Sequence, residues 1–179
     1  MSSIKSISDG LKLDDDQVAW IQPWLSKFGA WVYSGRIEKR QSSIIAEFMA
    51  TVERRDYPER EMCNDDDGML IAKVVDKIYH IDRIAFTLLL LRYAFGSSDR
   101  AIARYYHNIA KPRQMIRRNR TIEYKYRKPS MSTCRREIED IISSAEYLIY
   151  PHLKDAFKKR EKEWKSKNNS KNVLTSLSQ

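Results

Sequence analysis

Apolar side chains recur every three or four residues along most of this sequence, and that spacing is its strongest constraint on the fold. The first such run has eight apolar residues on one helical face: Val18, Trp20, Ile21, Trp24, Leu25, Phe28, Trp31 and Val32. Only five Gly and five Pro interrupt 179 residues, whereas a sandwich or barrel needs many turns. The pattern predicts an all-α fold, a helical bundle.

Capping residues and glycines divide the chain into helices. Short polar side chains that can cap a helix precede the apolar runs, and Gly35 and Gly96 end two of them. We expect helices over about 14–34, 42–52, 64–78, 82–95, 98–106 and 130–162, with 82–95 at the centre of the core. Pro151 should kink or break the last one. The segment 14–162 is thus predicted to form one helical domain. We expect a disordered tail over 1–13 and a disordered, basic tail over 163–179.

Positive charge is concentrated in one segment. Residues 100–136 contain twelve Lys and Arg against a single acid, Glu123, whereas the rest of the chain has 21 bases and 23 acids. Lysine and arginine neutralise phosphates and release counterions. The segregation favours a nucleic acid as partner, with an acidic protein and an ordinary basic surface as alternatives.

Other function classes find little support. The longest apolar stretch is too short to span a membrane, and no secretory signal opens the sequence. Cys63 and Cys134 stand alone, which fits a reducing cytoplasm and argues against a zinc or disulfide framework. No catalytic, cofactor or metal motif is found.

The acidic run Asp65–Asp67 before Gly68 invites a metal interpretation. Alignment to a calcium loop would place Cys63 and Val74 at coordinating positions, where neither can serve. The run is therefore interpreted as a helix start whose carboxylates suit the positive end of the helix dipole. A magnesium-dependent nuclease remains an alternative.

The basic segment has features of a helix-turn-helix. Ile102 and Ala103 would face the core, and a recognition helix would begin at Ser130. Its outward residues near the N-terminal end, where base edges are read, would be Ser132, Thr133, Arg135, Arg136 and Glu139. More than twenty residues, 107–129, replace the usual short turn, and we interpret them as a basic insertion along the DNA backbone. An ordinary three-helix bundle with a basic loop is the alternative.

The predicted DNA-binding residues combine the cations of this segment with the outward face of the recognition helix: Arg100, Arg104, Lys111, Arg113, Arg117, Arg118, Arg120, Lys125, Arg127, Lys128, Ser132, Thr133, Arg135, Arg136 and Glu139.

Five stretches, in this order, resemble the zinc-free class of lambdoid phage late-gene antitermination proteins, the Q proteins. They are WLSKFGAWVYSG, SSIIAEF, CNDDDGMLIAKVV, LLLLRYAFGSSDRAIARYY and MSTCRREIEDIISSAEYLI, within residues 24–150. The insertion over 107–129 and the tail after Lys158 exceed the family pattern, and either could contact extra DNA or nascent RNA.

The resemblance implies a mechanism. Family members bind a DNA element near the late promoter. They load next to sigma onto RNA polymerase paused just downstream of that promoter, and they narrow its RNA exit channel. DNA binding would then fall to Arg100–Tyr106 and Ser130–Glu139. The resemblance thus implies a non-enzymatic phage antitermination factor. Its partners would be duplex DNA, bacterial RNA polymerase with its sigma factor, and nascent RNA. The protein would also self-associate on DNA. A helix-turn-helix regulator without antitermination activity, and a phage nuclease that uses Asp65–Asp67, are the alternatives.

Overall fold

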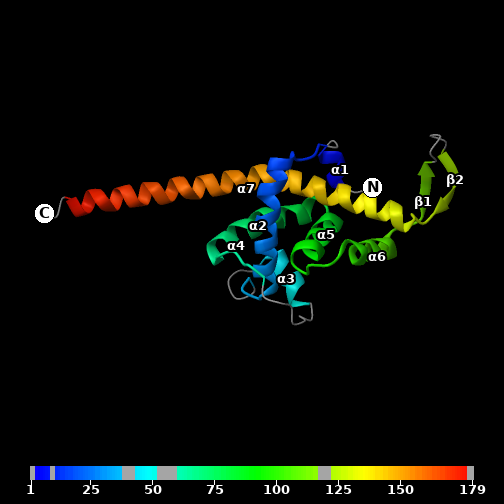
Figure 1. Cartoon of the computed structure of the whole chain (residues 1–179), viewed down its shortest axis with the longest axis horizontal. Helices are drawn as coiled ribbons and strands as arrows, with labels where there is room; N and C mark the ends of the chain where they lie inside the picture. The colour runs from blue at the N-terminus through cyan, green and yellow to red at the C-terminus, as the bar shows by residue number, and fades with distance from the viewer. Residues whose placement is uncertain (1–2, 9–10, 38–42, 52–59, 117–121, 177–179) are drawn as a thin grey trace.

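One long helix supports the rest of the molecule. The computed structural model of the chain describes residues 3–8, 11–37, 43–51, 60–116 and 122–176. Helix α7 (Met131–Ser176) runs the length of the molecule, and the other helices pack beside its first half (Figure 1). They are α1 (Ser3–Ile7), α2 (Asp15–Tyr33), α3 (Ile44–Ala50), α4 (Asp65–Ile81), α5 (Arg83–Tyr93) and α6 (Asp99–Ile109).

A β-hairpin is the only sheet among the described residues. Strands β1 (Arg113–Ile116) and β2 (Ile122–Arg127) pair antiparallel between α6 and α7. The all-α prediction is confirmed, with this hairpin as an addition that the sequence did not predict.

Side-chain caps begin the helices where the sequence places them. The Asp14 carboxylate accepts a hydrogen bond from the Gln17 amide at 2.8 Å, and the Gln17 side chain accepts one from the Asp14 amide. The remaining caps are Ser43, Asn64, Asp82 and Ser98. Gly35 and Gly96 take the positive φ values of 83° and 59° that follow helix ends.

The core lies between α7 and the helices α2, α4 and α5. The inward stripe of α7 is buried at Cys134, Ile138, Ile141, Ile142, Ala145, Ile149 and Leu153. Helix α5 buries Phe86 and the consecutive Leu88–Leu90, so more than one of its faces is covered and it lies centrally, as predicted. Trp31 is fully buried, and Gly68 leaves space for it, since a Cβ there would lie 2.5 Å from the indole.

The first residues are not the frayed tail that the sequence predicted. Ser3–Ile7 forms a helix, and Ile4 is completely buried. The Ile4 amide donates to the Asp82 carboxylate at 3.3 Å, and the Ser8 hydroxyl donates to Ser144 of α7 at 3.1 Å. One buried isoleucine and these polar contacts dock the segment on α5 and α7.

Helix α7 also departs from the prediction, because it continues through Pro151 and past residue 162 to Ser176. Pro151 is exposed, while Ile149 and Leu153 on either side are fully buried. The backbone hydrogen bond that proline lacks therefore costs little beside the packing that holds the adjacent turns. Beyond it, Glu161 and Lys165 form an ion pair at 2.7 Å at the spacing that supports a helix.

Gly29 sets how closely α2 approaches α5. A Cβ at this position would lie 2.0 Å from the Tyr93 carbonyl oxygen, which is backbone and cannot move alone. We predict that Gly29→Ala lowers the free energy of unfolding by about 1–3 kcal/mol despite the higher helix propensity of alanine. Urea denaturation measures it. The control is Ser26→Ala, at an exposed position of the same helix, and an equal effect of both substitutions would contradict the close approach.

Candidate nucleic-acid interface

Helix α6 presents a cationic face opposite its packing face. Ile102, Ala103 and Tyr106 are buried, at the spacing of one side of a helix. Arg100 and Arg104 are exposed. Hydrophobic packing on one side thus directs two guanidinium groups to solvent on the other.

The start of α7 is built in the same way. The Ser130 hydroxyl accepts a hydrogen bond from the Thr133 amide at 3.2 Å. With Cys134 and Ile138 buried, the side chains of Ser132, Arg135, Arg136 and Glu139 are exposed. Thr133 is half-buried, and its hydroxyl lies 2.9 Å from that of Ser130. Unpaired backbone amides at this helix end add positive potential beside the two arginines.

The two helices bring separate predicted residues together. Arg100 of α6 lines a groove of about 370 Å³ with Arg135 and Glu139 of α7. Arg92 and Asp99, which also line it, form an ion pair at 2.9 Å. The groove therefore places cations from both helices on one surface.

The hairpin lies within the segment 107–129 that the sequence analysis interpreted as a basic insertion. Arg113 pairs with Arg127 and Gln114 with Tyr126, and the register shifts before Ile116 pairs with Ile122. Two arginines directly opposite each other repel. A nearby acid would offset that repulsion.

Glu137 of α7 is this acid, and it anchors the hairpin. Its carboxylate forms an ion pair with Arg113 and accepts a hydrogen bond from the Tyr106 hydroxyl at 3.4 Å. Burial and, second, the Glu137 carboxylate raise the pKa of Tyr106, so its hydroxyl stays protonated and can donate. Glu137 thus joins α6, β1 and α7.

Sequence reasoning missed Glu137 and assigned Arg113 to DNA. In the structure Arg113 is half-buried with its charge partnered, which gives it a role in holding the hairpin. One feature of the sequence could have indicated this role. Glu137 is an acid that directly follows two arginines and lies beside the apolar stripe of α7.

The other predicted residues lie around the same end of the molecule. Lys111, Arg127 and Lys128 are exposed near the base of the hairpin, and the Lys128 ammonium donates to the Asn108 carbonyl at 3.4 Å. Lys125 belongs to β2. Arg117, Arg118 and Arg120 lie outside the described residues.

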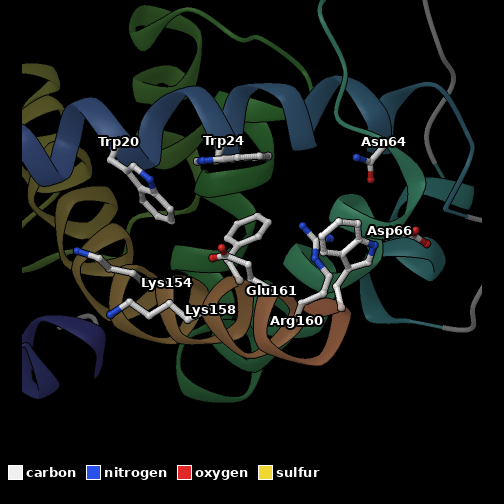
Figure 2. Close-up of a pocket in the computed structure, with 10 residues that line it drawn as sticks. Trp20, Trp24, Asn64, Asp66, Lys154, Lys158, Arg160 and Glu161 are labelled. Carbon is white, nitrogen blue, oxygen red and sulfur yellow. The ribbon is translucent and has the colours of Figure 1, made fainter. Parts of the chain in front are cut away.

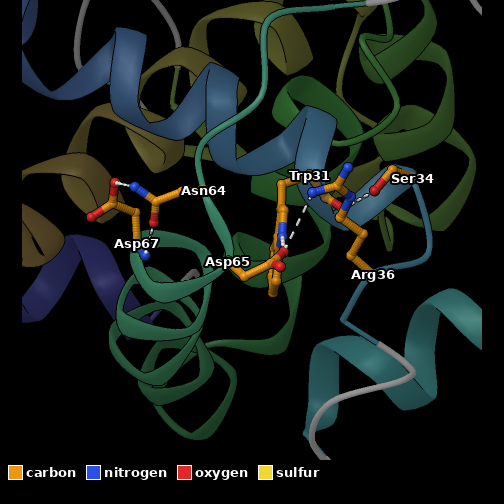
Figure 3. A network of polar contacts seen from close by, with 6 residues as sticks. All are labelled: Trp31, Ser34, Arg36, Asn64, Asp65 and Asp67. Atoms are coloured by element: carbon orange, nitrogen blue, oxygen red, sulfur yellow. Dashed lines mark hydrogen bonds and ion pairs between the residues drawn. The ribbon is translucent and has the colours of Figure 1, made fainter.

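The acidic run at the start of α4 has structural partners (Figure 3). Asp65 accepts a hydrogen bond from the Trp31 indole at 2.8 Å and lies 3.6 Å from the Arg36 guanidinium. Asp67 accepts one from the Asn64 side chain at 2.7 Å and forms an ion pair with Arg160. Figure 3 shows these two carboxylates engaged in different directions, so they do not converge on one ion.

The residues that the structure describes contain no group of three or more His, Cys, Asp or Glu placed to hold a metal ion. None of their helices is long and apolar enough to cross a membrane.

A helical body with exposed cations gathered at one end is typical of proteins that bind polyanions such as nucleic acids. The sequence model of the family "phage antitermination protein Q" matches residues 18–149, and the chain belongs to this family.

Solved structures agree with this assignment. Transcription antitermination factor Q21 in complex with Q21-binding-element DNA is 51% identical, covering 85% of this chain and 99% of that chain, with a TM-score of 0.77. The bacteriophage 21 Q protein is 50% identical over 84% of this chain and 98% of that one, with a TM-score of 0.72. No curated protein sequence matches the chain.

Glu137→Gln tests the anchoring of the hairpin. Loss of the ion pair with Arg113 should speed amide exchange in β1 and β2 severalfold while exchange in α2, α4 and α5 stays unchanged. Global stability should fall by less than about 1 kcal/mol, because the pair is partly exposed. Glu139→Gln removes the same charge from an exposed position of the same helix. Hydrogen exchange at the hairpin that is equal in both variants would contradict the anchor.

Proposed function

We propose that this protein binds duplex DNA through the end formed by α6, the hairpin and the first turns of α7, and acts there as a phage transcription antitermination factor. The observation that carries the proposal is the shared surface of Arg100 and Arg135, which joins cations of two helices. The rest of the chain is nearly neutral, so DNA would attract this end of the molecule first.

The exposed residues divide between two roles. Arg100, Arg104 and Lys128 suit phosphates, because each presents a cation on the rim. Arg135 and Arg136 lie in the first turns of α7, the part of a recognition helix that reaches base edges, and arginine reads guanine in a bidentate manner. In this proposal α6 and α7 act as a helix-turn-helix pair whose turn is replaced by the hairpin, which lies along the DNA backbone.

Family membership supports the assignment of partners. A protein half identical to this chain was solved with its binding-element DNA. Antitermination requires action on a transcribing polymerase, so bacterial RNA polymerase with its sigma factor, in the host cytoplasm, is the proposed protein partner. Self-association on DNA stays a prediction.

The two alternative functions, a regulator without antitermination activity and a nuclease, differ in how well they fit the structure. A regulator without antitermination activity would use the same DNA-binding end, and only transcription assays separate it. A nuclease would need Asp65 and Asp67 to bind a metal, but both carboxylates already stabilise Trp31, Asn64 and Arg160.

DNA binding tests the proposed interface. Arg135→Ala and Arg136→Ala should each weaken binding to the specific element by about 1–3 kcal/mol if they read bases, and should weaken binding to random duplex much less. Fluorescence anisotropy across a salt series measures both. Lys73→Ala, at an exposed position of α4, is the charge-matched control and should change neither affinity. Equal losses on specific and random DNA would show that the arginines contact phosphates only.

A further inference from the structure

An aromatic groove lies away from the hairpin end, between α2 and the second half of α7. Its volume is about 630 Å³, and it is walled by Trp20 and Trp24 of α2 and by Phe157 and Trp164 of α7. Figure 2 shows the two α2 indoles directed toward α7, with Lys154 and Lys158 at one side. The α7 residues follow position 149, where the family match ends.

The groove is held in shape by contacts among its own residues. The ring centroids of Trp24 and Phe157 are 4.7 Å apart, and Trp20 meets Phe157 edge-on at 6.1 Å. The Arg160 guanidinium lies over the Phe157 ring and pairs with the buried Asp67 of α4. This part of α7 is therefore fixed to the body of the protein.

Trp164 stands out in this setting, because it is 64% exposed one turn beyond Arg160. Most of this indole therefore faces solvent and does not pack against the body of the protein. It lies seven residues from Phe157, two turns or about 10 Å along the same side of α7. These two side chains form an aromatic row.

Cations accompany the aromatic row. Residues 154–167 contain seven Lys and Arg against three acids. Lys154, Lys158 and Lys165 share the adjoining side of the helix at intervals of four and seven residues, and all three are exposed. Glu161 lies within this row, and Lys165 is its ion-pair partner at 2.7 Å.

We propose that this groove binds single-stranded nucleic acid, with a base stacked on Trp164 and phosphates beside Lys154 and Lys158. Aromatic faces next to a cationic track are how proteins bind single strands without reading sequence. A duplex keeps its bases stacked internally and could use only the lysines. The groove is separate from the proposed duplex interface, so this inference does not depend on that interface.

The test is binding of a labelled 12-nucleotide single-stranded RNA to the full-length protein, with excess unlabelled duplex DNA present to occupy the other end. Trp164→Ala should weaken RNA binding about tenfold, and Trp164→Phe should restore most of it, because either ring can stack. Duplex binding should be unchanged in both variants. Unchanged RNA binding by Trp164→Ala, or an equal loss with duplex, would overturn the proposal.

Matched charge variants test whether phosphates lie beside the lysines of the groove. Lys158→Gln should weaken RNA binding about threefold and reduce its salt dependence, whereas Lys159→Gln, exposed but outside the groove, should have little effect. Glu161→Gln should strengthen binding about twofold by removing repulsion of phosphate, with Glu163→Gln as its control. Equal effects within each pair would overturn the site. The proposal would also be overturned if Trp164→Ala kept its RNA binding but lost binding to RNA polymerase, since the groove would then bind a protein.

Discussion

The packing of one apolar stripe along α7 against the helical body determines where the two proposed binding surfaces of this protein lie. The stripe runs from Cys134 to Leu153 and is buried throughout. Its first turns pack against α6, so Arg135 lies beside Arg100 in one groove, and Arg136 is exposed on the same turns. Its later turns bring Phe157 against the tryptophans of α2. A single amphipathic helix thus connects the two proposed binding surfaces, which differ in their chemistry.

Electrostatic balance inside the protein separates structural charges from those available to a partner. Carboxylates that pack near the core are matched by specific donors: Asp65 by Trp31, Asp67 by Arg160 and Glu137 by Arg113. The nearly fully buried Glu146 accepts a hydrogen bond from the Tyr93 hydroxyl at 2.5 Å, and burial raises the pKa of that phenol, so it remains a donor. The cations on α6 and early α7 are exposed instead, and we propose that they attract DNA.

Much of the fold follows from local chemistry, and so it could be predicted. Apolar spacing located the helices, and Asp14, Asn64 and Ser98 cap the helices that were expected to follow them. Features set by distant contacts could not be foreseen. The Ile4 amide bonds to the Asp82 carboxylate 78 residues away, and Arg113 of the hairpin pairs with an acid 24 residues from it in sequence. In the candidate site, the exposure of Arg135 followed from helical periodicity, whereas the role of Arg113 required knowing where Glu137 lies.

We propose that the end carrying Arg135 and Arg136 binds DNA and that this binding produces antitermination. Transcription in vitro by bacterial RNA polymerase, on a template with the phage late promoter and a downstream terminator, tests this link. We expect the wild-type protein to increase read-through and the Arg135→Ala/Arg136→Ala double variant not to increase it. The charge-matched Lys73→Ala/Lys77→Ala variant should behave as wild type. Full read-through by the double variant would contradict it, as would tight DNA binding by the wild-type protein with no read-through.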